Sequence, residues 1–505
     1  MGFLIMALVF FVIRGAKGAV VLSRRMLFRL LELLDMEESM PLFGRPDDPN
    51  HRQDDFDAEK LRDPMSSKWG TGWTIVKTAL PRFLRPRGLR YNPDRIHETA
   101  YLDSLRGYAA CAVYMFHMYG YPEGDVMSQP ILRLYSAGPA MVNLFFVISG
   151  YVLSLRMLKL MRAQQSAQLL DCLASSTFRR YLRLYIPTAL ATFLTIIMIH
   201  LGWCKPVLRL PSWWEQFWDW LDDVGYSSDP FQAIDGWYSL KGFRTKFLDQ
   251  MWTIPVEFRG SIILFALCTA TCKLSTRSRM GVSSLVIFFS YYWEVIYVAS
   301  FVAGMLIADL SLSWNPSRRS KTRLPQLRSD ENNHSLHNRG LTMVQQTGFI
   351  ALFFVGLVLL SQPEDLGIEG PFPFQYLIYG IPAHYSDGAE HFWLSIGAIL
   401  TITALEYSPS LQKPLTWGIS LYIGELSFGI YAMHNSLLWV LYYEIMAPWK
   451  AAHYPESKWI YLPITVIMTT VVIWAADYFT RVDQKLVGFG RWLQRKSFEK
   501  WELDP

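Results

Sequence analysis

The residues with the clearest chemical potential lie in an apolar segment, Tyr101–Gly120, which also contains Asp103, Arg106 and His117. Arg106 and His117 are 11 positions apart. On an α-helix, at about 100° and 1.5 Å per residue, they project from one face and lie about 16 Å apart along the axis. Charged groups inside a bilayer are costly and persist where they face a bundle interior or a wet cavity. The pair therefore indicates a polar path through a helical bundle.

Each of these residues also has an ordinary explanation. Asp103 and Arg106 fall in the first turns of the helix and can reach lipid headgroups from there. His117 can be an interior histidine whose hydrogen bonds are satisfied by neighbouring helices. The face that it shares with Arg106 favours the functional interpretation.

A second group of charges lies in the segment SSTFRRYLRLYIPTAL, residues 175–190. One of its first three residues can cap a helix. Arg180 and Arg183 then lie on one face at spacing i, i+3, with Arg179 beside them. Guanidinium groups bind phosphate oxygens in bidentate fashion, so this face is a candidate phosphate-binding surface at the cytosolic mouth. The alternative is the ordinary basic flank of a membrane span, and Arg183 favours binding because it enters the span.

Three further polar residues lie within apolar segments. Glu257 is predicted at about the depth of His117, where a carboxylate can fix the tautomer of a histidine and stabilise its imidazolium; an interfacial pair with Arg259 is the alternative. His434 lies in the middle of a predicted helix and is either a site residue or a histidine bonded within the bundle. For Ser149, close helix packing beside a glycine is a sufficient explanation.

The composition excludes other kinds of protein. Of the 505 residues, 51% are hydrophobic and 18% are charged, whereas a soluble domain has about 25% charged residues. The net charge of +5 is small for this length and gives no indication of nucleic-acid binding. The five cysteines are scattered and lack neighbouring ligands, so neither a metal site nor a disulfide framework is predicted.

Apolar runs near 20 residues predict an all-α integral membrane protein with about ten transmembrane helices. The region from Val282 to Leu312 lies between basic segments, which stay in the cytosol, so we predict two short or tilted helices there. The same rule places both the N- and the C-terminus in the cytosol. The other eight helices are predicted at residues 102–120, 138–157, 183–202, 251–272, 343–361, 389–406, 418–445 and 459–477.

The membrane domain is predicted over residues 101–480, between polar segments. Before it, residues 1–34 predict an interfacial segment, because their apolar run is too short to span a bilayer, and residues 35–100 predict a polar cytosolic lead-in. Residues 313–342 predict a basic cytosolic loop and residues 481–505 a cytosolic tail. The Trp-rich residues 203–250 predict a non-cytosolic loop, interpreted as a helix lying on the bilayer or as a lid over a substrate entrance.

Five sequence blocks occur in one order over about Tyr101 to Asp483. They are LDSLRG followed by His117, FFVISGY, FRRYLRLYIP, MWTIPVE and LSFGIYAMH. Together they resemble the membrane-bound acyltransferase-3 family. The sequence departs from the family at Ile254 and Pro255, which alter a W-T-L-x-x-E block, and at Tyr151, which replaces the commoner Phe.

The resemblance implies a role for each matching residue. His117 corresponds to the essential histidine and Arg106 to the arginine that accompanies it. Arg180 and Arg183 match a cytosolic pair associated with acyl-CoA. Glu257 matches the glutamate of the W-T-L-x-x-E block and is expected to be catalytic beside His117, and His434 matches the late histidine of a Y-x-x-H block. His434 and, from its position, Ser149 are expected to bind substrate.

The resemblance further implies the reaction. An acyl group, with acetyl favoured, passes from the co-substrate acyl-CoA to a hydroxyl of a small molecule, natural product or glycan, in an endomembrane or the plasma membrane. No bound cofactor is expected. His117 takes the hydroxyl proton as general base, or forms a covalent acyl-histidine. The main alternative is a multi-pass transporter with a buried Arg/His/Glu path, and a membrane scaffold is the third; release of free CoA during turnover separates the enzyme from the transporter.

Overall fold

The computed structural model describes residues 80–85, 88–91, 96–121, 126–230, 245–314, 343–363, 372–385 and 389–498. The predicted interfacial segment 1–34, most of the lead-in 35–100 and the basic loop 313–342 lie outside these ranges. The chain divides into two compact units, Met1–Arg90 and Tyr91–Pro505. The described part of the first unit contains the short 3-10 helix η2 (Arg82–Leu84). All elements considered below belong to the second unit.

The second unit is helical, and no strand occurs in the ranges that the structure describes, which confirms the predicted all-α class there. The first half contains α4 (Ala100–Tyr119), η4 (Leu132–Ser136), α5 (Gly138–Arg162), α6 (Ser166–His200), α7 (Trp213–Ser227), η5 (Asp249–Trp252), α8 (Thr253–Thr271), α9 (Thr276–Tyr292) and α10 (Ile296–Trp314). The second half contains α12 (Met343–Leu360), α13 (Phe374–Leu377), η7 (Ile378–Gly380), α14 (Ala389–Tyr407), α15 (Pro409–Gln412), η8 (Lys413–Thr416), α16 (Gly418–Glu425), α17 (Ser427–Leu437), the π-helix η9 (Leu438–Met446), α18 (Ala447–His453) and α19 (Tyr461–Ser497).

The chain is a multi-pass membrane protein. Within the described ranges, 6 helices are long and apolar enough to cross a membrane, namely α5, α6, α8 with η5, α10, α12 and α19, and α14 with its bent continuation through η8 makes up to 7. The predicted count of ten is not confirmed. Two helices, α9 and α10, occupy the region predicted to enter and return, but α9 has only 17 residues. The cytosolic location of both termini stays a prediction.

Two helices extend well beyond their predicted ends. α6 begins at Ser166 instead of residue 183, and α19 ends at Ser497 instead of residue 477. Hydropathy marks only the part of a helix that lies in the membrane, whereas leucine, alanine, glutamine and arginine favour helix in water as well. The predicted cap at residues 175–177 is therefore wrong. Ser175 lies inside α6, where its hydroxyl donates to Gln494 Oε1 of α19 at 3.1 Å.

The predicted helix 418–445 is divided into α16, α17 and η9. Just before the first division, the segment crosses α4 closely at two glycines. A Cβ atom on Gly107 would lie 2.4 Å from the carbonyl oxygen of Ile423, and one on Gly424 would lie 2.7 Å from the backbone nitrogen of Ser104. The helix breaks at Leu426, directly after this crossing, and α17 then leads into a π-helix. Such π segments are frequent at functional sites.

The Trp-rich region contains the amphipathic helix α7, so its helical interpretation is confirmed. Ser212 caps the helix by accepting from the backbone nitrogen of Trp214 at 3.2 Å. Trp214 and Trp218 point outward, with 66% and 58% of their surface exposed. On the other face Trp220 Nε1 donates to Thr192 Oγ1 of α6 at 2.9 Å. Whether α7 lies on the bilayer or covers an entrance stays a prediction.

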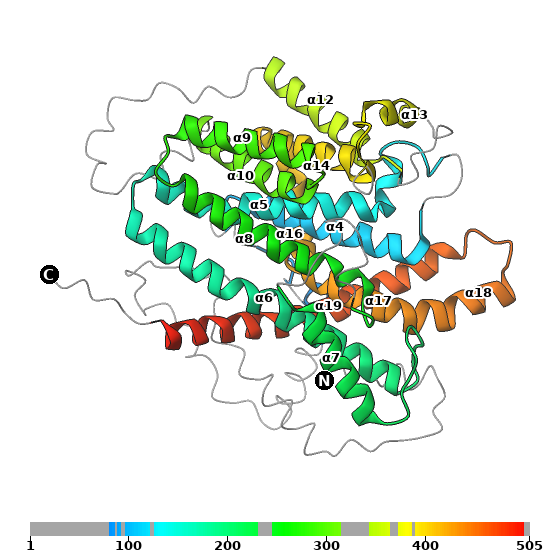
Figure 1. Ribbon diagram of the computed structural model, residues 1–505. Coiled ribbons are helices and arrows are strands. Elements are labelled where there is room, and N and C mark those ends of the chain that lie inside the picture. The colour runs from blue at the N-terminus through cyan, green and yellow to red at the C-terminus, as the bar shows by residue number, and fades with distance from the viewer. Residues whose placement is uncertain are drawn as a thin grey trace, which may run out of the picture. The chain divides into compact units, whose positions relative to one another are not determined.

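Five helices close a ring in which each contacts its two neighbours, in the order α4, α5, α8, α6 and α17. In Figure 1, α4 and α5 run side by side through the bundle. The helices α9, α10 and α14 lie on one side of α5, and α6 and α8 lie on the other. This ring positions the site described below.

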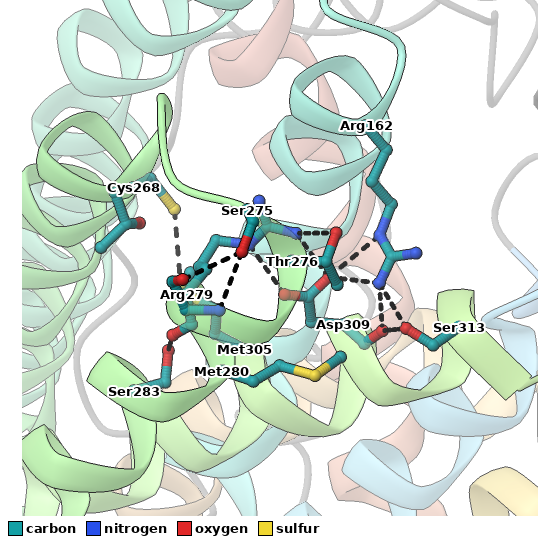
Figure 2. A network of polar contacts seen from close by, with 12 residues as sticks. Arg162, Cys268, Ser275, Thr276, Arg279, Met280, Ser283, Met305, Asp309 and Ser313 are labelled. Atoms are coloured by element: carbon teal, nitrogen blue, oxygen red, sulfur yellow. Dashed lines mark hydrogen bonds and ion pairs between the residues drawn. The ribbon is translucent and has the colours of Figure 1, made fainter.

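A buried ionic cluster joins the ends of α5, α9 and α10 (Figure 2). The Arg279 guanidinium donates to both carboxylate oxygens of Asp309, at 2.7 and 2.9 Å. Arg162 donates to the same carboxylate at 2.7 Å and to the Asp309 carbonyl oxygen at 2.6 Å. The side chains of Arg279 and Asp309 are each only 2% exposed. The cluster therefore fixes three helices through a carboxylate whose charge is fully compensated.

Candidate active site

All seven predicted site residues lie on the ring of five helices, at positions that the chain separates widely. They fall into three groups. The residues are Arg106 and His117 on α4, Ser149 on α5, Arg180 and Arg183 on α6, Glu257 on α8 and His434 on α17.

The first group is a pair of histidines. The imidazole rings of His117 and His434 have centroids 5.2 Å apart, at an angle of 38°. His434 is fully buried, and its Nδ1 lies 3.0 Å from the carbonyl oxygen of Ile430. Because a carbonyl oxygen only accepts, Nδ1 carries the hydrogen and Nε2 carries a lone pair. Nε2 has no hydrogen-bond partner among the described residues, so His434 offers an acceptor nitrogen in a ring beside His117.

The start of α8 and the helix α17 hold this pair in place. Asn435 Nδ2 donates to Gln250 Oε1 at 2.6 Å, and the hydroxyls of Tyr431 and Thr253 lie 2.6 Å apart. The carboxylate of Asp249, in η5, lies within electrostatic reach of His117. Sequence analysis missed Asp249, although its position just before the MWTIPVE block is a signal that could have been used.

The second group is centred on Glu257. Its Oε1 accepts from Ser149 Oγ at 2.6 Å and from Arg180 Nη2 at 2.5 Å, while Arg180 Nε donates to Ser261 Oγ at 2.7 Å. Arg180 and Glu257 are 11% and 15% exposed.

The structure therefore gives Glu257 a different partner from the predicted ones. Within the described ranges no hydrogen bond or ion pair joins it to His117, and its counter-ion is Arg180 instead of Arg259. Asp249, in the turn η5 before α8, lies within electrostatic reach of His117, and Glu257 follows about two turns further along the chain.

The third group consists of arginines from two helices. Arg106 Nε donates to Ser427 Oγ at 3.1 Å, and its Nη2 lies 3.2 Å from Asp103 Oδ1. Arg183 is exposed and, in the part of the chain that the structure describes, forms no hydrogen bond or ion pair. Arg106 and Arg180 both lie within electrostatic reach of it. Three cations converge here, and the Asp483 carboxylate of α19 also lies within electrostatic reach of Arg183 and Arg106. Because Arg183 itself forms no ion pair in the described ranges, the group is suited to an anion with several negative charges.

Tyr431 connects the groups. Its ring centroid lies 6.0 Å from that of His434, and its hydroxyl lies within electrostatic reach of Glu257. Polar groups thus follow one another from the three arginines through Glu257 to the histidine pair. In the described ranges no three His, Cys, Asp or Glu side chains are grouped as metal ligands would be.

This arrangement coincides with the extent of a known domain. Residues 99–478 match an acyltransferase domain, that of the acyltransferase-3 family. The chain belongs to the acyltransferase-3 family. It is therefore an acyltransferase, and the matched residues include every member of the three groups.

The acyltransferase is similar to fungal relatives over most of its length. It is 30% identical to the O-acetyltransferase PaAT-1 of Phomopsis amygdali over 455 residues, which cover 82% of this chain and 88% of the relative. It is 23% identical to the acyltransferase R4 of a Phoma species and 24% identical to the acyltransferase clz18 of Cochliobolus lunatus, in each case over 67% of this chain and 82% of the relative. No solved structure matches the chain.

Proposed function

We propose that this acyltransferase transfers an acyl group, with acetyl favoured, from acyl-CoA to a hydroxyl of a small molecule, natural product or glycan. The observation that carries the proposal is that one ring of five helices holds the arginines, the Arg180–Glu257 pair and the histidine pair. The relative named as an O-acetyltransferase supports acetyl transfer to oxygen. Family membership favours this enzyme over the alternative of a transporter with a buried polar path.

Arg183 and Arg106 are suited to bind the phosphates of the donor. Arg183 forms no ion pair among the described residues, although the Asp483 carboxylate lies within electrostatic reach of it, and the Arg106 side chain is 36% exposed. Arg180 is already paired with Glu257, and it adds its positive charge to the phosphate site from one side. The pantetheine arm would then extend along α4, where Arg106 and His117 are about 16 Å apart. An extended thiol arm matches a narrow path of that length.

The histidine pair is suited to the chemical step. His117 is half-buried and so can reach a substrate, whereas His434 is enclosed. His117 accepts the proton of the acceptor hydroxyl, whose oxygen attacks the thioester carbonyl. The new C–O bond forms, the C–S bond breaks, and His117 returns the proton to the sulfur to give free CoA. His434 is proposed as a positioning residue, because its Nε2 lone pair can accept from the second nitrogen of His117 and thus set its tautomer.

The test uses the purified full chain in phosphatidylcholine nanodiscs with labelled acetyl-CoA. A panel of sugars, alcohols and phenols serves as acceptors, and both free CoA and the O-acetyl product are measured. We expect CoA release that depends on an acceptor and equals ester formation. Movement of a solute across proteoliposomes without CoA release would contradict the proposal and support the transporter.

A further inference from the structure

A second polar site lies apart from the three groups, where the start of α5 meets the end of α12 and the start of α14. It is a small pocket whose lining includes Tyr121, Arg133, Pro139, Gln362 and Glu390. Arg133 belongs to η4, the short helix between α4 and α5. None of these residues was predicted from the sequence to have a function.

Arg133 is a buried cation that forms no ion pair in the described part of the chain. It is 6% exposed, and its side chain forms no hydrogen bond or ion pair with any residue that the structure describes. Its charged contact is with the ring of Phe374, whose centroid lies 5.8 Å from Cζ. Burial lowers the pKa of Arg133. An arginine nevertheless stays protonated in a protein, so a positive charge is buried here without a direct ion pair among the described residues, which is costly.

Gln362 leaves a second group in the same pocket unsatisfied. It is 6% exposed, and both its Oε1 and its Nε2 lack partners among the described residues. Buried side-chain amides normally have partners for these atoms. The neighbouring Ser361 Oγ accepts from the backbone nitrogen of Ile131 at 2.9 Å. Ile131 has a φ of 69°, a conformation that β-branched residues rarely adopt, so the backbone beside Arg133 is held against Gln362 in a strained form.

We propose that this pocket binds a single oxyanionic group, a carboxylate or a phosphate. Arg133 supplies the positive charge, and Gln362 Nε2 supplies a hydrogen-bond donor. The space suits one functional group and not a whole molecule. Glu390 also lines the pocket, but its carboxylate is paired with His391 Nε2 at 3.2 Å. Its negative charge weakens the binding of any anion here, so a carboxylate or a singly charged phosphate should bind more tightly than a doubly charged one.

Two successive contacts between aromatic rings connect the pocket to His117. The Tyr121 ring is 4.9 Å from that of Phe116, and the Phe116 ring is 5.4 Å from that of His117. An acceptor whose acidic group occupies the pocket could therefore extend its hydroxyl to His117. This extension rests on the proposed function, and it would make the acceptor a hydroxy acid or a phosphorylated alcohol.

The binding test uses benzoate and inorganic phosphate as probes, with benzamide as the neutral match to benzoate. The melting temperature of the full chain in phosphatidylcholine nanodiscs is measured against probe concentration. We expect benzoate or phosphate, but not benzamide, to raise it, and Arg133→Gln to weaken that response about 10- to 100-fold, the effect of losing a charge-assisted bond. Glu390→Gln should strengthen it. Arg209→Gln, at an exposed arginine, is the matched control and should leave it unchanged.

Further arms distinguish the source of the oxyanion and the role of the arginine. A stabilisation by phosphatidic acid nanodiscs that Arg133→Gln abolishes would identify a lipid headgroup, whereas the same pattern with benzoate identifies a soluble acid. If Arg133 were only structural, Arg133→Gln would lower the melting temperature without ligand; we expect it unchanged or raised, since an unpaired charge is removed. Equal responses of wild type and Arg133→Gln to all probes would overturn the proposal. If the protein responds to benzoate but releases no CoA, the pocket proposal stands and the proposed function is refuted.

Discussion

Two arginine–carboxylate clusters inside this acyltransferase differ in how completely they are satisfied. Around Asp309, two arginines from two helices occupy both carboxylate oxygens, and Arg279 and Asp309 are 2% exposed (Figure 2). Around Glu257, Arg180 occupies one oxygen, and the neighbouring Arg183 forms no ion pair in the described ranges. The Asp309 carboxylate therefore has partners on both oxygens, whereas the groups beside Glu257 include side chains without partners in the described ranges.

The difference separates residues that hold the fold from residues that await a ligand. A buried ion pair is costly to break because its remaining charge has no compensation. The Asp309 cluster is therefore accounted for by folding alone. Folding alone does not account for the guanidinium of Arg183, which forms no ion pair in the described ranges, or for His434 Nε2, which has no hydrogen-bond partner there. A bound phosphate would pair with the first, and the imidazole of His117 can donate to the second. The predictions below test this division.

The largest effect on stability is expected for Asp309→Ala. It leaves the buried Arg279 without a counter-ion, and breaking such a pair costs about 3–5 kcal/mol. Thermal unfolding in nanodiscs measures this loss. Asp219→Ala is the matched control, because Asp219 pairs with Lys246 at the surface, where such pairs contribute about 0–1 kcal/mol. Equal losses in the two variants would remove the distinction between the clusters.

A smaller effect, on binding instead of stability, is expected for Arg183→Ala. Each charge-assisted bond to phosphate contributes about 1.5–3 kcal/mol, so acyl-CoA should bind about 10- to 100-fold more weakly. A short acyl thioester without the nucleotide should bind as before. The double variant with Arg180→Ala should weaken acyl-CoA binding further, but it should also lower stability because it unpairs Glu257. If the substitutions weakened the binding of acyl-CoA and of the short acyl thioester equally, Arg180 and Arg183 would serve only to set the orientation of the helix in the membrane.

His434→Ala is expected to reduce turnover modestly. A neutral hydrogen bond contributes about 0.5–1.5 kcal/mol, so the loss of a positioning contact should lower kcat about 2- to 10-fold with little change in KM. Steady-state kinetics on the purified enzyme measures both constants. A loss as large as that of His117→Ala would instead make His434 the general base.

The smallest effect is expected for Ser212→Ala, which removes the cap of α7. Loss of an N-cap typically costs about 1 kcal/mol of stability, and turnover should not change if α7 only lies on the bilayer. Measuring kcat beside the melting temperature separates the two interpretations of the Trp-rich region. A drop in kcat beyond the loss in stability would favour a lid over the substrate entrance.

Sequence periodicity predicted which residues share a face of one helix. It did not predict which side chains from two different helices pair with each other. The common face of Arg106 and His117 follows from helix geometry, and the basic flanks led to two helices between residues 276 and 314. The pairing of Arg180 with Glu257, 77 positions apart, depends on which helices are neighbours, and no local pattern encodes that.

Other features were missed because hydropathy reports only burial in the lipid. It could not show that α6 and α19 extend beyond their predicted ends, or that the helix divides near Leu426, directly after a glycine crossing with α4. Arg133 lies in a short polar connection without periodicity, so its burial is visible only in three dimensions.

The most direct test of the account is the turnover of His117→Ala in nanodiscs, measured as CoA release and ester formation beside the melting temperature. The His117 side chain makes ring contacts with Phe116 and His434 but no hydrogen bond within the described ranges, so the fold and acyl-CoA binding should persist. Turnover should fall about 10²- to 10⁴-fold, as expected for the loss of a general base. A stable His117→Ala protein that still acylates its acceptor within about threefold of the wild-type rate, less than any general base contributes, would contradict the account.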